Sequence, residues 1–171
     1  QHPQFVENIR FEAEGVQVLL VHIVGSANNS EHPDEAEPRT KAAMDWIIDS
    51  FAHARQQDAA AVVLALHAAM FASAFGPIWD KQAFLPHSPF AEIGNLIRSE
   101  AAAFKRPVLL VHGDGHQLTL WRPFRDGAPN LMALEVFGGS HMHAVEITID
   151  TGDPAVFGYR PIFTPAQIGQ P

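Results

Sequence analysis

The stretches AAVVLALH at residues 60–67 and PVLLVH at residues 107–112 decide the fold that this sequence is expected to adopt. Each is a short, continuous apolar run that ends in a histidine. Runs of this kind are typical of strands that are covered on both faces, as parallel strands in α/β proteins are. The two stretches therefore predict buried strands, each with a polar side chain at its carboxyl end.

Two helices are predicted beside these strands. Residues 40–57 carry apolar side chains near helical spacing, and Ser88-Pro89 offers a cap and a first-turn proline for a helix to about residue 104. Residues 27–39 are expected to form an exposed loop, and residues 68–87 a long, ordered one. Further strands are predicted at 15–24, 117–121, 131–137 and 143–149. The order β-α-β-α-β-β-β-β predicts an α/β or α+β layer fold, with two main helices packed on a mixed sheet.

The composition is that of one ordinary globular domain, spanning residues 1–171. The formal charge is 11 − 19 = −8, which disfavours a nucleic-acid partner, because phosphate binding needs clustered cations. No apolar run approaches the roughly 18 residues that span a bilayer. The absence of cysteine excludes disulfides, thiolate metal sites and cysteine nucleophiles, and it leaves the compartment open. The first residue is Gln1 and no leader pattern follows it, so we expect a processed or cut N-terminus.

The candidate chemistry lies in the polar residues that follow the buried strands. His67 closes one strand, His112 closes another, and His116 follows across the tight turn Gly113-Asp114-Gly115. Binding sites of open α/β sheets form at the carboxyl ends of the strands, and imidazole with carboxylate suits Zn²⁺, Mn²⁺ or iron. The alternative for His67 is a strand-end histidine bonded to a carbonyl. The alternative for the turn is that Asp114 caps its own backbone.

The other histidines offer weaker signals. His141 and His143 are two residues apart, so they share a face of the predicted strand; a polar hairpin edge explains them better than a metal site does. His22 lies inside an apolar run and is expected to be a satisfied core histidine. The sequence contains no Gly-rich phosphate loop, G-x-S-x-G elbow, H-E-x-x-H or dinucleotide fingerprint, so no catalytic residue is assigned.

A family resemblance joins these motifs. The succession VVLALHAAMF (62–71), a helix, PVLLVHGDGHQLTL (107–120), NLMALEVFGG (130–139) and HAVEITID (143–150) resembles the C-terminal half of calcineurin-like metallophosphoesterases. It is most similar to a bacterial subgroup in which G-D-x-H stands where the general family has G-H-x-H. VHIVGSANN (21–29) resembles the strand and loop that follow the central metal-binding motifs of that subgroup. The resemblance covers nearly all of the chain and implies the C-terminal half of a four-layered α/β/β/α sandwich.

The resemblance also implies a ligand set. His67 matches the family's lone histidine ligand, and His116 matches the last histidine of the final block. Asp114 stands where the first histidine of that block would be, so Asp114 or His112 is expected to complete the set. The family's D-x-H, G-D-x-x-D and G-N-H blocks do not occur in residues 1–66. The implied function is therefore metal-dependent hydrolysis of phosphate esters in an intact protein, a hydrolase with Mn, Fe or Zn as cofactor. This chain is expected to be inactive alone.

The implied partners follow from the same expectation. Strands that are apolar on both faces need cover, so we expect the chain to bind the missing N-terminal half or to self-associate. The alternative function is a non-catalytic binding or scaffold domain that kept the fold and lost the metal centre. A third reading is a self-contained mononuclear site formed by His67, His112 and His116.

Overall fold

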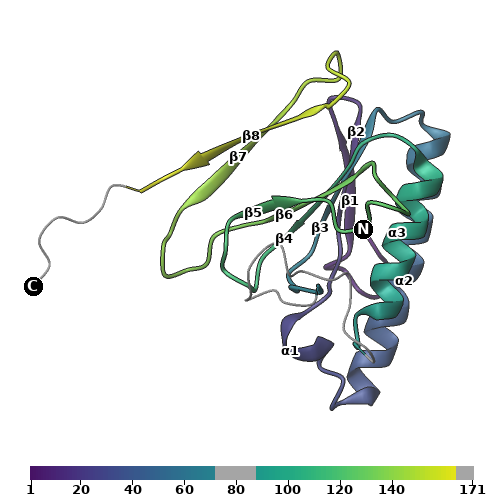
Figure 1. Ribbon diagram of the computed structural model, residues 1–171. Helices are drawn as coiled ribbons and strands as arrows, with labels where there is room; N and C mark the ends of the chain where they lie inside the picture. The colour runs from purple at the N-terminus through teal and green to yellow at the C-terminus, as the bar shows by residue number, and fades with distance from the viewer. Residues whose placement is uncertain (72–87, 165–171) are drawn as a thin grey trace, which may run out of the picture.

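The computed structural model describes residues 1–71 and 88–164 and places six strands in one mixed sheet (Figure 1). The strand order is β1-β2-β3-β4-β6-β5. Strands β2, β3, β4 and β6 run parallel, and the two edge strands run antiparallel to their neighbours. All four parallel strands therefore end at the same edge of the sheet. The strands are β1 (Ile9–Ala13), β2 (Val16–Leu20), β3 (Ala61–Ala65), β4 (Val108–His112), β5 (Thr119–Trp121) and β6 (Leu131–Glu135).

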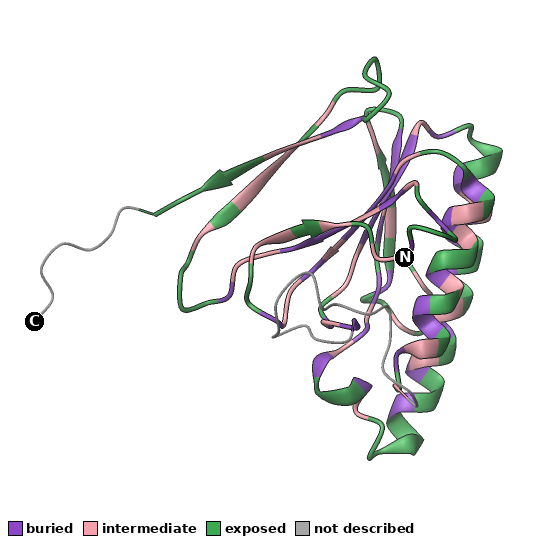
Figure 2. Ribbon diagram, in the orientation of Figure 1, coloured by how far each residue is buried: buried purple, intermediate pink, exposed green. Residues whose placement is uncertain are grey.

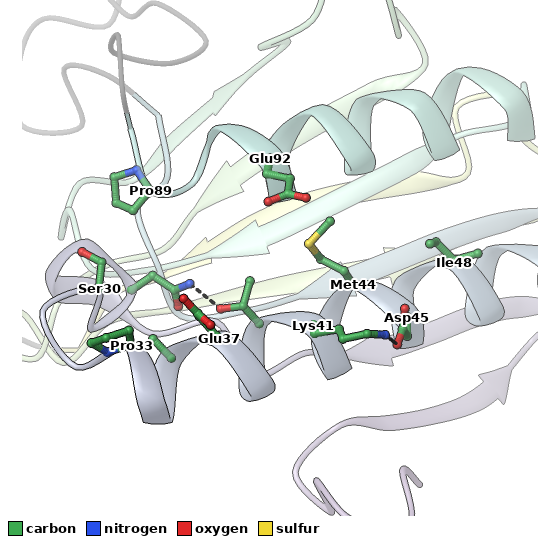
Figure 3. Close-up of a pocket in the computed structure, with 12 residues that line it drawn as sticks. Ser30, Pro33, Glu37, Lys41, Met44, Asp45, Ile48, Pro89 and Glu92 are labelled. Carbon is green, nitrogen blue, oxygen red and sulfur yellow. Dashed lines mark hydrogen bonds and ion pairs between the residues drawn. The ribbon is translucent and has the colours of Figure 1, made fainter.

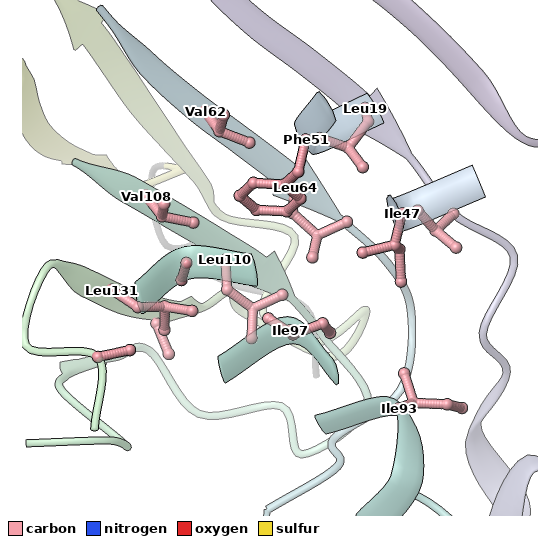
Figure 4. Packing of buried hydrophobic residues seen from close by; sticks show 14 of the residues in the cluster. Leu19, Ile47, Phe51, Val62, Leu64, Ile93, Ile97, Val108, Leu110 and Leu131 are labelled. Atoms are coloured by element: carbon pink, nitrogen blue, oxygen red, sulfur yellow. The ribbon is translucent and has the colours of Figure 1, made fainter. Parts of the chain in front are cut away.

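Two helices cover one face of this sheet. Helices α2 (Pro33–Gln56) and α3 (Ala91–Phe104) lie side by side against it (Figure 1). Val62, Leu64 and Leu110 are alternate residues of their strands, and they are fully buried beneath the helices (Figure 4). The helices contribute Ile47, Phe51, Ile93 and Ile97 to the same cluster. This cluster is the main core, and it fixes the central strands whose ends carry the candidate site.

A hairpin covers part of the opposite face. Strands β7 (Ala144–Ile149) and β8 (Phe157–Ile162) pair antiparallel as a separate two-stranded sheet. Phe157 packs with Val63 and Leu109 in a second buried cluster. Figure 2 shows buried residues concentrated in the central strands and more exposed ones along the hairpin. The sheet is therefore more fully covered on its helical face than on its hairpin face.

The mixed sheet with two main helices is confirmed, whereas the four-layered sandwich stays a prediction. The predicted loop over residues 27–39 is wrong, because α2 begins at Pro33. Proline suits the first helical position, and Asp34 and Glu35 suit the positive end of the helix dipole. Arg39 bonds back to Glu35 one turn earlier. The polar composition that indicated a loop is that of a solvated helix N-terminus.

Other boundaries differ as well. The strand predicted over 15–24 ends at Leu20, and strands β1 and β8 were not predicted. The loop predicted over 68–87 lies mostly outside the described residues. Among the residues that are described, no helix is both long and apolar enough to cross a membrane.

Candidate functional site

His67 and Asp114 come together at the carboxyl edge of the parallel strands. His67 follows β3 by two residues and Asp114 follows β4 by two. Because these strands are neighbours, the two side chains lie close, with 3.8 Å between His67 Nε2 and Asp114 Oδ1. The side chain of His67 is 64% exposed and that of Asp114 is 32% exposed, so both can be reached from solvent.

Backbone contacts fix this pair. The Ala69 amide donates to Asp114 Oδ2 at 3.3 Å, and the Gly113 amide donates to the His67 carbonyl at 3.2 Å. A Cβ atom placed on Gly25 would lie 2.6 Å from Asp114 Oδ2. Glycine at position 25 therefore lets the Asp114 carboxylate lie directly against the backbone that follows β2.

A cavity of about 410 Å³ opens beside the pair. Its wall includes a short left-handed turn, α1 (Gly25–Asn28), which continues into Asn29. Four consecutive non-glycine residues of this turn have φ between 50° and 57°. Such a conformation costs roughly 1–2 kcal/mol per residue, so the surrounding contacts must hold it. The cavity is lined by Val24, Gly25, Ser26, Asn29, Glu35, Arg39, His67 and Asp114.

Arg39 is the main contact that holds the turn. Its guanidinium is buried, with Nη1 donating to Asn28 Oδ1 at 2.8 Å and Nη2 donating to the Asn28 carbonyl at 3.0 Å. Its Nε donates to Glu35 Oε1 at 2.6 Å. The hydrogen bonds from Arg39 and Asn29 lower the pKa of Glu35 to about 2. Hydrogen bonds to Asn28 and Asn29 therefore tie α2 to the turn, and the Arg39–Glu35 ion pair within α2 stays charged at neutral pH.

The other two predicted ligands lie differently. His112 is 3% exposed and its ring packs edge-on against Phe71 at 5.8 Å, on the core side of β4. Its Nδ1 lies 3.3 Å from the Gly113 carbonyl. His116 is exposed, has a φ of 61°, and packs on Gly138 so closely that a Cβ there would overlap the ring. The structure thus joins His67 with Asp114, while His112 lies in the core and His116 lies against the loop after β6.

Sequence reasoning missed one carboxylate at this edge. Glu135, the last residue of β6, is fully buried and is the register partner of His112. Its carboxylate accepts a hydrogen bond from the backbone amide of Gln117 at 3.4 Å and one from the Thr119 hydroxyl at 3.5 Å. The signal was available, because Glu135 is the one charged residue inside the apolar run LMALEVF. A buried carboxylate beside a buried imidazole can hold the ring in one orientation, and a pair of this kind often supports a neighbouring site.

The histidines outside this edge have structural surroundings. His143 packs edge-on between Phe137 and Phe163, with ring centroids 5.0 and 5.1 Å away, and its Nδ1 lies 3.1 Å from the Thr164 hydroxyl. The prediction that His22 belongs to the core is wrong. Its side chain is 40% exposed and its Nδ1 pairs with Glu7 at 2.8 Å, because β2 has already ended.

A larger cavity, of about 480 Å³, lies between α2 and the start of α3 (Figure 3). Lys41 on its wall is paired with Asp45 at 2.5 Å, and Asn28 donates to Thr40 at 2.8 Å. Among the described residues its lining has carboxylates but no histidine. This cavity therefore lacks the imidazole beside a carboxylate that the smaller cavity has, and the smaller cavity is the better candidate site.

The donor chemistry at the smaller cavity fits a divalent metal in part. An imidazole nitrogen and a carboxylate that approach from adjacent strands are ligands that Zn²⁺, Mn²⁺ and iron accept. Within residues 1–71 and 88–164, however, no three His, Cys, Asp or Glu side chains are gathered closely enough to hold a metal ion. Two donors leave most of a coordination shell to be filled.

Comparison with known proteins adds no further assignment. Neither the models of known protein families nor the curated protein sequences give a match to this chain.

Proposed function

We propose that this chain supplies the C-terminal ligand blocks of a metal-dependent phosphoesterase. The observation that carries the proposal is the 3.8 Å approach of His67 Nε2 to Asp114 Oδ1 beside an open cavity. This pair lies at the carboxyl edge of parallel strands, where α/β sheets build their binding sites. The ordered motif resemblance assigns ligand roles to the same residues.

Each residue has a role in this proposal. His67 and Asp114 would hold a divalent metal, whereas His116, which the resemblance also makes a ligand, packs against Gly138 and does not join them in this structure. When bound, the metal would polarise the phosphate ester and lower the pKa of a bound water. The Ala69 amide and the backbone of Gly25 fix the position of the Asp114 carboxylate. His112, buried at the end of β4, would act as an orienting group.

The remaining metal ligands would come from another polypeptide segment. Two donors are too few for a two-metal centre, so we propose that the active form is an assembly with the N-terminal half of the phosphoesterase or with a second copy of the chain. The hairpin face of the sheet, where cover is incomplete, is the surface available for that contact.

The first test is metal binding and hydrolysis by the intact protein encoded by the full reading frame. Loaded with Mn²⁺, it should hydrolyse p-nitrophenyl phosphate or bis(p-nitrophenyl) phosphate. Loss of an outer-shell group typically lowers metal affinity about ten- to a hundredfold, so His67→Asn and Asp114→Asn should each cost at least that much. His53→Gln, near the C-terminal end of α2, is the matched control and should change neither the Mn²⁺ affinity nor the rate of hydrolysis. An intact protein that binds Mn²⁺ but hydrolyses neither ester would end the enzyme proposal.

The second candidate is a non-catalytic binding or scaffold domain. It is favoured by the two-donor site, because no third ligand of the kind sought joins the pair among the described residues. In that case titration of the intact protein with Mn²⁺ and Zn²⁺ should give no saturable binding. Elemental analysis of the purified protein, which should then contain no stoichiometric metal, separates the two functions.

A further inference from the structure

A second cavity, of about 360 Å³, lies at the opposite end of the sheet from His67 and Asp114. It lies where β4 and β6 begin, against the turn that joins β7 to β8 and the first residues of β8. Its apolar surface comes from side chains of the sheet, the hairpin and the segment before β4. Its polar groups are Lys105 after α3, Arg122 after β5, Asn130 before β6 and Tyr159 within β8.

Two cationic side chains on this cavity lack acidic partners among the residues that the structure describes. Six Lys and Arg side chains of the described chain form ion pairs with carboxylates. Lys105 and Arg122 do not pair with any carboxylate in the parts of the chain that are described. The chain as a whole carries a formal charge of −8, so two free cations on one cavity are a local reversal of its charge.

The groups around these cations favour an anion with an apolar body. Arg122 Nε donates to the Pro129 carbonyl at 3.0 Å, which orients its guanidinium. Burial raises the pKa of the Tyr159 phenol, and Arg122 opposes that rise. A neutral phenol can donate a hydrogen bond. Two carboxylates lie in the neighbouring turn, but Asp150 accepts from the Gly152 amide at 2.9 Å and Asp153 from the Ala155 amide at 2.8 Å.

We infer that this cavity binds a small organic anion, an apolar body of aromatic size that carries one anionic oxygen group. The body would lie on Pro107, Met132 and Phe157, and the anionic group would lie between Lys105 and Arg122. A cavity with a mainly apolar wall and a few convergent polar groups is the usual form of a small-molecule site. The Lys105 ammonium can make a single charge-assisted hydrogen bond to the anionic group, and the Arg122 guanidinium can make a bidentate one.

Benzoate is the probe that tests this site, with the metal-free protein kept in EDTA so that the metal-site proposal plays no part. Amide chemical shifts of Asn130, Met132 and Tyr159 should move in a saturable way. Lys105→Gln and Arg122→Gln should each weaken binding roughly tenfold, because each removes a charge-assisted contact. Arg125→Gln is the matched control: Arg125 is an exposed cation of the same region that does not line the cavity.

Two comparison probes separate the parts of the inference. Benzyl alcohol keeps the ring without the charge, and inorganic phosphate keeps the charge without the ring. Both should bind at least roughly tenfold more weakly than benzoate. The inference is overturned if benzoate moves none of the three amides, or if Arg125→Gln weakens binding as much as Arg122→Gln does. Phosphate binding as tight as that of benzoate would also overturn it, because the apolar wall would then play no part.

Discussion

Gly25 controls how closely the Asp114 carboxylate approaches the backbone after β2. Its φ is not in the left-handed region, so the backbone itself accepts alanine. The constraint is space, because three atoms of the Asp114 side chain lie within 2.9 Å of the position that a Cβ would take. These atoms are the end of a flexible side chain, which can move where backbone could not. A change at Gly25 should therefore disturb the site more than the fold.

We predict that Gly25→Ala displaces Asp114 from His67 while lowering the free energy of unfolding by only about 1 kcal/mol. Urea unfolding measures the stability, and a crystal structure of the variant measures the distance from His67 Nε2 to the carboxylate. Gly139→Ala is the control, since nothing lies within 4 Å of a Cβ placed there. An unchanged distance in Gly25→Ala would show that the close approach is not what positions the carboxylate.

Glu35, which lines the same cavity, makes the stability of the protein depend on pH. Its pKa falls from 4.5 to about 2 because Arg39 and Asn29 donate hydrogen bonds to the carboxylate. A depressed pKa in the folded state means that the stabilisation is complete above pH 4.5 and is lost as the pH falls toward 2. We predict that Glu35→Gln removes this part of the acid sensitivity of unfolding, measured by urea midpoints across that window. The exposed Glu37→Gln, on the same helix, should keep the acid sensitivity of the original protein.

Among the elements, the left-handed turn α1 is strained and is held from outside. Ala27 has φ 55° and ψ 32°, which a residue with a Cβ adopts at a cost and glycine adopts freely. The buried Arg39 supplies the compensating hydrogen bonds to Asn28. This turn forms part of the cavity wall, so the strain is located where a site would use a fixed backbone.

The same chemical change should act in opposite directions in two elements. Ala27→Gly should stabilise the protein by about 1 kcal/mol, because it relieves the left-handed strain. Ala52→Gly, in the regular part of α2, should destabilise it by about 1 kcal/mol, because glycine is a poor helix former. Thermal or urea unfolding of the two variants decides the matter. A loss of stability in Ala27→Gly would mean that the turn is not strained as its dihedral angles indicate.

How far the sequence could predict these elements depends on whether a pattern is local. The apolar runs at β3 and β4 and the amphipathic part of α2 are local, and they were predicted. Strand β1 lies at the edge of the sheet, pairs only with β2 and has no buried residue, so its own residues carried little signal. The pairing of His67 with Asp114 depends on β3 and β4 being neighbours, whereas the burial of Glu135 depends on β4, β5 and β6 together. Such contacts between distant segments are not visible in a single sequence.

At the scale of the whole molecule, the hairpin face of the sheet leaves apolar residues uncovered at one edge. Ile9 is 38% exposed, Phe11 is 50% exposed and Leu20 is 37% exposed. Ile9 and Leu20 are register partners, and Phe11 is two residues from Ile9, so the three side chains share a face of β1 and β2. Val16 and Val18 lie on the same face, but they pack in the second buried cluster, which the hairpin covers. These three exposed residues form the edge strip, the part of this face that the hairpin does not protect.

We predict that the chain self-associates through the edge strip, so that its weight-average sedimentation coefficient rises with concentration. Burial of an exposed phenylalanine contributes about 1.5–3 kcal/mol, so Phe11→Ser should weaken association by roughly tenfold or more. Ile48→Ser is the matched control, because Ile48 is 44% exposed on α2, on the opposite side of the sheet. If both variants and the original chain sediment as monomers at the highest attainable concentration, self-association is excluded and the strip needs another partner. If Ile48→Ser weakens association as much as Phe11→Ser does, the contact lies on the helical face instead, and incomplete cover of the sheet is not what drives it.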